Sequence, residues 1–173
     1  MEAEELVDLP EKTHKPLERR IGVSMAVFAA LLAISTLMGH RLHTEEVVLQ
    51  TKTADGWAYY QAKVIRSQMY TADAGLAMLQ GDNGVSLAGD WATKAGQERK
   101  DADGIQHDTQ QLERETEAAA QRATLFDASE VFLEIAIVLC SIALMTGSAR
   151  FWAISFVSAA IGAVASIAAF LPR

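Results

Sequence analysis

Three long stretches of apolar residues constrain the fold of this chain more than any other feature of its sequence. They cover residues 21–39, 131–147 and 151–170. The first and third contain no charged residue, and the second contains one, Glu134. A helix rises 1.5 Å per residue, so about 20 apolar residues match the roughly 30 Å hydrocarbon core of a bilayer. The sequence therefore predicts an all-α integral membrane protein with three transmembrane helices.

The connections between the stretches predict how the helices are arranged. Only three residues separate the second stretch from the third, so we expect an antiparallel helical hairpin there. The first stretch is longer than the apolar region of a cleaved signal peptide, and no small-residue cleavage site follows it. We therefore expect an uncleaved anchor.

Basic residues near the ends of the stretches predict the topology. If the chain crosses the membrane three times, five basic residues lie on the same side of it: Lys12, Lys15, Arg19, Arg20 and Arg150. By the positive-inside rule that side is the cytoplasm, with residues 1–20 as an N-terminal tail. Residues 40–130 then lie outside, and the C-terminus ends outside. Residues 40–130 contain nine Lys and Arg and 15 Asp and Glu, so their net charge is −6. A negative charge of this size suits a translocated segment.

Residues 40–130 predict an extracytoplasmic helical hairpin. We expect a weak break at Asp55–Gly56, a turn at 81–84, and the end of a helix near 101–104. From about Asp108 a single helix is expected to run to Gly147, because no Gly or Pro interrupts it. Helical spacing predicts that the ascending arm buries Trp57, Tyr60, Val64, Ser67, Tyr70, Ala74 and Met78. The descending arm has a near-heptad face of Ile105, Leu112, Ala119, Ala123 and Phe126.

The buried face of this hairpin contains few large apolar side chains. Two helices with one aromatic cluster and several alanines bury little surface to offset the entropy of ordering the chain. Packing against further copies would supply the missing area. The sequence therefore predicts a homo-oligomer or a subunit of a larger membrane complex, with the lipid bilayer as its other partner.

Two sequence segments resemble a known family. The stretch Trp57-Ala58-Tyr59-Tyr60-Gln61-Ala62-Lys63 follows a single span, and the segment 133–139, LEIAIVL, opens the terminal hairpin. Together they resemble the bacterial domain of unknown function 4337 family over roughly residues 20 to 170. The resemblance implies a bacterial membrane protein with this layout, and it implies no activity and no catalytic residue. With the predicted topology, we expect the chain in the bacterial inner (plasma) membrane.

An acidic face opens the second span. Asp127, Glu130 and Glu134 are spaced i, i+3 and i+7, so they share one side of a helix. An ionisable side chain about one turn inside a span is a candidate functional residue. One interpretation is an acidic ring that admits protons or cations in an oligomer. The other is a set of interfacial carboxylates that reach head groups or cap a neighbouring helix.

Two further clusters are candidates for packing. Trp57, Tyr59, Tyr60 and Lys63 could bind a ligand or partner, but such a cluster more often forms the packing centre of a hairpin. In the third span Ser158, Gly162 and Ser166 form a small-residue face suited to close helix packing. The sequence leaves open whether that face packs within the chain or between copies.

Several functional classes find little support. His40 and His43 are spaced like a metal pair but lack further ligands in register, and the segment 101–110 lacks the ligands of a calcium loop. We expect no metal and no cofactor. The net charge of −7 argues against nucleic-acid binding, and no nucleophile–base pair or phosphate loop indicates an enzyme. The expected function is therefore a non-enzymatic structural or accessory membrane subunit; the alternative is a small ion channel or transport subunit that uses Asp127, Glu130 and Glu134.

Overall fold

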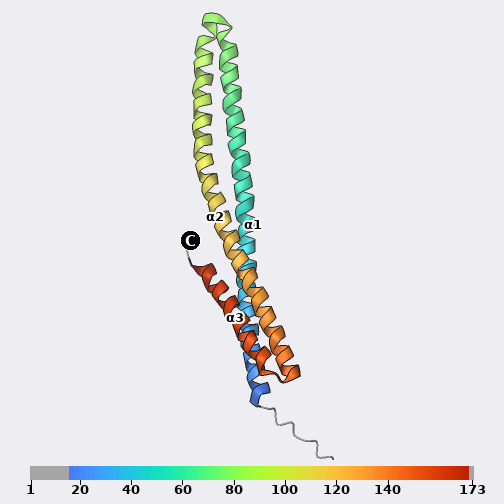
Figure 1. Ribbon diagram of the computed structural model, residues 1–173. Coiled ribbons are helices and arrows are strands. Elements are labelled where there is room, and N and C mark those ends of the chain that lie inside the picture. Colours follow the sequence, from blue (N-terminus) through green and yellow to red (C-terminus); the bar gives the residue numbers. More distant parts are fainter. Residues whose placement is uncertain (1–15, 172–173) are drawn as a thin grey trace, which may run out of the picture. The chain divides into compact units, whose positions relative to one another are not determined.

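A computed structural model describes residues 16–171, and this part of the chain is entirely helical. Helix α1 covers Pro16–Met78, a short 3-10 turn η1 covers Gly81–Asn83, α2 covers Val85–Thr146 and α3 covers Ala149–Phe170 (Figure 1). Each of the three α-helices contains a stretch long and apolar enough to cross a membrane. The all-helical architecture with three candidate spans is confirmed. Lys12 and Lys15 lie outside the described residues.

Two of the expected interruptions are absent from the helices. α1 continues through Asp55–Gly56, and α2 begins at Val85 and continues through residues 101–104. Both predictions of a break were wrong, because an interior Gly costs a helix only about 1 kcal/mol and packing against a second helix offsets that cost. The predicted turn at 81–84 is present. Gly81 has φ 68°, a left-handed conformation that favours glycine, and Gly147 ends α2 in the same way with φ 64°.

Contacts between the helices divide the chain into two units. The first contains residues 16–39 and 124–171 of the described chain, and the second contains residues 40–123. The second unit is a helical hairpin in which the two arms lie side by side on either side of the η1 turn (Figure 1).

The hairpin arms meet along residues that alternate at spacings of three and four, the pattern of a left-handed coiled coil. We call these buried and half-buried residues the hairpin seam. On α1 they are Leu42, Glu46, Leu49, Thr53, Gly56, Tyr60, Lys63, Ser67, Tyr70, Ala74 and Ala77. On α2 they are Ala88, Trp91, Ala95, Glu98, Ala102, Ile105, Thr109, Leu112, Thr116, Ala119 and Ala123. Met78 was expected on this face but is exposed, because the spacing places Ala77 there instead.

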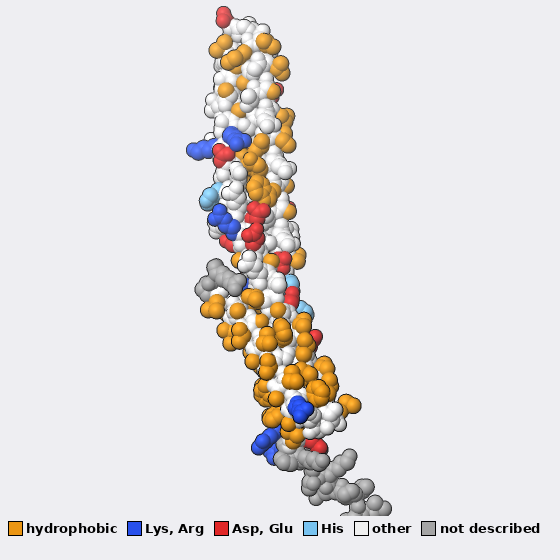
Figure 2. Space-filling model, viewed as in Figure 1, with side chains coloured by type: hydrophobic (Ala, Val, Ile, Leu, Met, Phe, Trp, Pro, Cys, Tyr) orange, Lys and Arg blue, Asp and Glu red, His pale blue; other side chains and the backbone are white. Residues whose placement is uncertain are grey.

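The first unit packs parts of all three helices together. Its core is formed by Ile21, Phe28, Leu133, Ala136, Cys140, Ala143 and Ala159. Many large apolar side chains of this unit point outward, including Val27, Ile34, Val138 and Val164. Hydrophobic side chains accordingly cover much of its visible face in Figure 2. An apolar exterior of this kind is what a helix bundle presents to lipid.

Candidate functional site

Hydroxyl groups connect all three helices of the first unit. The Ser35 hydroxyl lies 3.2 Å from that of Ser129 and 2.9 Å from that of Ser166. The Ser129 and Ser166 hydroxyls are 2.6 Å apart. Each helix therefore contributes one serine to a common hydrogen-bonded cluster. Such contacts between spans are worth about 0.6 kcal/mol each in a membrane, so this cluster fixes the helix register more than it stabilises the fold.

The small-residue face of α3 packs within the chain. Ser158 donates a hydrogen bond of 2.7 Å to the backbone carbonyl of Phe132. A Cβ added at Gly162 would lie 3.0 Å from the carbonyl oxygen of Ser129 and 3.1 Å from Cγ of Leu133. Ser166 joins the serine cluster. The structure thus places all three predicted residues of this face against α2 of the same chain.

The three acidic residues near the start of the second span differ in their surroundings. Glu130 is half-buried, and its Oε1 accepts a hydrogen bond of 2.9 Å from the Thr36 hydroxyl of α1. Asp127 and Glu134 are exposed on α2. Glu130 thus joins two helices, whereas Glu134 is an exposed carboxylate of α2.

Glu134 lies deeper along the bundle than a count from residue 131 suggests. Phe132 and Cys140 flank it on α2 and contact Ser158 and Ser155 of α3. These serines lie roughly 9–14 Å from the start of a helix about 33 Å long, so Glu134 is level with the central third of α3. Apolar packing between α2 and α3 extends to Phe126, whose ring lies 5.5 Å from that of Phe170. The part of α2 that packs against α3 therefore begins before residue 131, at about Phe126.

The aromatic cluster of the hairpin contains two different environments. Trp57 and Tyr60 are half-buried and meet edge to face, with ring centroids 5.6 Å apart. Tyr59 is exposed, and its ring centroid lies 5.9 Å from Nζ of Lys63. Lys63 is buried, and its side chain crosses to the opposite arm. The cluster therefore places Tyr60 on the hairpin seam with the ring of Trp57 against it, and leaves Tyr59 on the surface.

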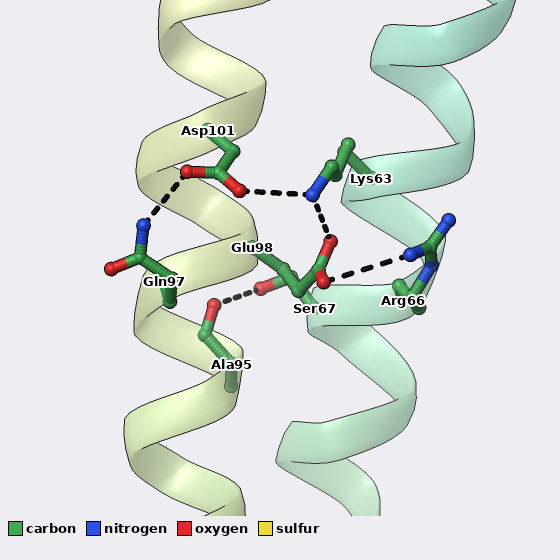
Figure 3. Close-up of polar contacts among 7 residues, drawn as sticks. All are labelled: Lys63, Arg66, Ser67, Ala95, Gln97, Glu98 and Asp101. Atoms are coloured by element: carbon green, nitrogen blue, oxygen red, sulfur yellow. Dashed lines mark hydrogen bonds and ion pairs between the residues drawn. The ribbon is translucent and has the colours of Figure 1, made fainter.

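Lys63 is the centre of a network of charged groups across the hairpin seam (Figure 3). Its Nζ lies 2.9 Å from Oδ2 of Asp101 and 3.0 Å from Oε2 of Glu98. Arg66 approaches the other oxygen of Glu98 at 3.7 Å, and Gln97 donates to Asp101 at 2.8 Å. One turn further along α1, the Ser67 hydroxyl donates to the carbonyl of Ala95 at 2.9 Å. One lysine thus joins two carboxylates of the opposite helix.

These contacts shift two ionisation equilibria in opposite directions. The hydrogen bonds to Asp101 and then to Glu98 raise the pKa of Lys63 above its ordinary value of 10.5. The hydrogen bonds from Lys63 and then from Gln97 lower the pKa of Asp101 below its ordinary value of 3.8. Both shifts favour the charged forms, so Lys63 and Asp101 are both ionised throughout the neutral range.

The chemistry of this network is structural. A buried ion pair adds little net stability, because desolvation of the charges offsets their attraction. A polar contact in a heptad seam instead disfavours other alignments of the two helices. If one arm were shifted along the other, a charge would be buried without a partner. Lys63, Glu98 and Asp101 therefore specify how the two arms align.

Two further candidates from the sequence have local partners. His43 lies 3.5 Å from Glu46, one turn along α1. Asp103 of the rejected calcium loop pairs with Arg99 at 3.4 Å on α2. Within residues 16–171, no group of three or more His, Cys, Asp and Glu side chains is arranged to hold a metal ion.

Sequence reasoning missed the partners of Lys63 and the partners of Ser166. Glu98 and Asp101 lie 35 and 38 positions from Lys63, and Ser35 lies 131 positions from Ser166. The continuous spacing of three and four on each arm was the signal that could have aligned Lys63 with Glu98. No local pattern indicates which serines of three separate spans meet.

Comparison with known proteins identifies the family. A family model described as "Domain of unknown function (DUF4337)" matches residues 17–172, nearly the whole chain. The chain belongs to this family, as its Trp57–Lys63 segment and its span layout indicated. The searches of curated proteins and of solved structures gave no match.

Proposed function

We propose that this member of the DUF4337 family is a non-enzymatic subunit of a bacterial inner-membrane assembly. Its three apolar helices anchor it, with the N-terminus cytoplasmic, and its hairpin associates with the hairpins of other copies or with a larger complex. The observation that supports this proposal is a second apolar stripe on α1, separate from the hairpin seam.

This outer stripe follows spacings of four and three from residue 58 to residue 79, a rise of about 31 Å along a helix. Its members are Ala58, Ala62, Ile65, Met69, Ala72, Leu76 and, just beyond the helix end, Leu79. Each lies two positions from a seam residue, which is about 200° around the helix. All seven are exposed, and Ile65, Met69, Leu76 and Leu79 are each more than half exposed.

A stripe with this spacing fits a nearly parallel helix. Copies inserted in one membrane with one topology present their α1 helices in the same direction, so equivalent stripes can meet in register. The residues that would face each other beside such a contact are Gln61 with Arg66 and Gln68 with Asp73. Neither pair repels, so the flanking positions are compatible with a homotypic contact.

The hairpin's internal structure is consistent with this arrangement. The ion pairs and hydrogen bonds of the seam already occupy the polar groups between the two arms. The outer stripe is therefore free to contact another helix without disturbing the hairpin. A single stripe of this length buries less surface than a stable interface between soluble proteins does. Insertion in one membrane would raise the local concentration of the copies, so a smaller contact can hold them together.

The test compares two charged substitutions on the same helix. Met69 is 59% exposed and belongs to the outer stripe, whereas Met78 is 67% exposed and does not. We expect the wild-type complex extracted in mild detergent to exceed the mass of one chain. Met69→Glu should reduce that mass, because it buries a charge in the contact, and Met78→Glu should leave it unchanged.

Two results would count against the proposal. A wild-type chain that is monomeric in several mild detergents and in native membranes would contradict the assembly role. A complex whose mass survives Met69→Glu would show that the copies, or a different partner, use another surface.

Glu134 favours the second candidate function, a small ion channel or transport subunit. It is an exposed carboxylate level with the central third of α3, among the exposed apolar residues Val131, Ile135 and Val138. In an oligomer, Asp127 and Glu134 of several copies would line a common acidic path beside Glu130. Cation flux into liposomes that is abolished by Glu134→Gln would support this function, and no flux above that of empty liposomes would exclude it.

A further inference from the structure

A groove between α1 and α3 lies at the end of the first unit where α1 begins. Its volume is about 750 Å³, within the range of ligand-binding sites. It is lined by Arg19, Arg20, Val23, Ser24, Val27, Phe28, Trp152 and Phe156. The lining is divided by chemistry, because two arginines occupy the first turn of the groove and apolar side chains occupy the following two turns.

The apolar wall of the groove is held in place by specific contacts. The ring of Phe156 lies between those of Phe28 and Trp152, with centroid separations of 5.2 and 5.5 Å and edge-to-face geometry. The Trp152 indole donates a hydrogen bond of 2.9 Å to Ser24, whose hydroxyl in turn donates to the carbonyl of Arg20. The polar groups inside the groove are thus satisfied, and the wall presents hydrocarbon.

The two arginines are exposed and have no ion pair with any residue in the part of the chain that the structure describes. None of the described residues that line the groove is a carboxylate. A guanidinium group can bind phosphate oxygens through two parallel hydrogen bonds. The groove therefore offers two cationic anchors next to a rigid apolar wall, at the depth where a span meets the head-group region.

We propose that this groove binds one phospholipid with an anionic head group. Its phosphate lies against Arg19 and Arg20, and one acyl chain follows Val23, Val27 and the rings of Phe28 and Phe156. A zwitterionic lipid fits the same apolar wall but lacks the net charge that two arginines select, and basic pockets between spans commonly select anionic lipids. This inference rests on the membrane insertion that is part of the proposed function, but not on self-association.

The protein contains a reporter for this site. Of the tryptophans at positions 57, 91 and 152, only Trp152 lies in an apolar span, and it lines the groove. The purified chain is reconstituted in vesicles of phosphatidylcholine with a minor fraction of brominated lipid, which quenches tryptophan fluorescence on contact. Brominated phosphatidylglycerol is compared with brominated phosphatidylcholine at equal mole fraction.

We expect wild-type Trp152 to be quenched more strongly by brominated phosphatidylglycerol, with an apparent preference on the order of fivefold per arginine. The double change Arg19→Gln with Arg20→Gln should remove the preference. Arg150→Gln is the matched control, since Arg150 carries the same charge near the same bundle end but does not line the groove. It should retain the preference.

The other outcomes distinguish this inference from the proposed function. Equal quenching by the two lipids, or a preference that survives the double change, overturns the lipid site while showing that the spans are in the bilayer. Loss of the preference in Arg150→Gln also overturns it, because the selectivity would then reflect general surface charge. Absence of quenching by either lipid overturns membrane insertion and the lipid site together.

Discussion

At the scale of single residues, Lys63 is the charged group that joins the two arms of the hairpin. It closes the aromatic segment 57–63, which was expected to form the packing centre of the hairpin. The structure adds that its ammonium group is buried against Glu98 and Asp101. The pairing depends on the alignment of two helices, which no sequence window shorter than the hairpin contains.

The lowered pKa of Asp101 predicts how the stability of the hairpin depends on pH. A carboxyl group whose pKa is lower in the folded chain stabilises that state above its ordinary pKa, here 3.8, and this contribution is lost as pH falls through the lowered value. The thermal unfolding midpoint of the full chain in detergent, followed by circular dichroism, should therefore fall in acid below about pH 4. Asp101→Asn should lower the midpoint at pH 7 and weaken its acid dependence.

Asp103→Asn is the control for this experiment. Asp103 lies two residues further along α2, and its ion pair among the described residues is an exposed one with Arg99. Exposed pairs of this kind contribute little to stability, so its pH profile should follow that of the wild type. If the two variants had the same profile, the acid dependence would not come from the Lys63 network.

At the scale of helices, the periodicity of the sequence predicted the arms and the turn but overestimated the effect of glycine. Gly56 and Gly104 were both read as signs of interruption, yet each lies inside a continuous helix. Their surroundings differ in a way that only the packed structure reveals. Gly56 faces the buried Thr109 of the opposite arm, whereas a Cβ added at Gly104 would have no non-local atom within 4 Å.

This difference predicts opposite effects for the same substitution. A Cβ at residue 56 would lie 3.0 Å from Cγ2 and 3.2 Å from Cβ of Thr109, and closer still to its hydroxyl oxygen. Gly56→Ala should therefore destabilise the hairpin by about 1–3 kcal/mol through overpacking, less the helix propensity it gains. Gly104→Ala should stabilise it by about 0.5–1 kcal/mol. The measurement is the thermal unfolding midpoint of each full-length variant, compared with that of the wild type. Equal shifts of the midpoint in the same direction would mean that the arms do not approach closely at residue 56.

At the scale of the whole molecule, the number and order of the candidate spans followed directly from three apolar stretches, because each is long enough to cross a bilayer as a helix. The contacts between the helices of the first unit could not be predicted from these apolar stretches. The small-residue face of α3 was compatible with packing inside the chain or between copies, and the structure uses it against Ser129, Phe132 and Leu133 of α2. A self-contact surface must therefore be sought elsewhere, and the outer stripe of α1 is the candidate.

The proposed orientation in the membrane predicts which residues are accessible from outside the cell. Arg19, Arg20 and Arg150 flank the ends assigned to the cytoplasm, and residues 40–130 have a net charge of −6. Cys140 is the only cysteine and is buried, so Cys140→Ala provides a cysteine-free background. In intact cells an impermeant thiol reagent should label Ser86→Cys in the hairpin but not Ala149→Cys, although both positions are exposed on the chain. After permeabilisation both should react, which shows that Ala149→Cys is protected by the membrane and not by folding. Labelling of Ala149→Cys alone in intact cells would reverse the topology and place the acidic hairpin in the cytoplasm, where its partners would have to be sought.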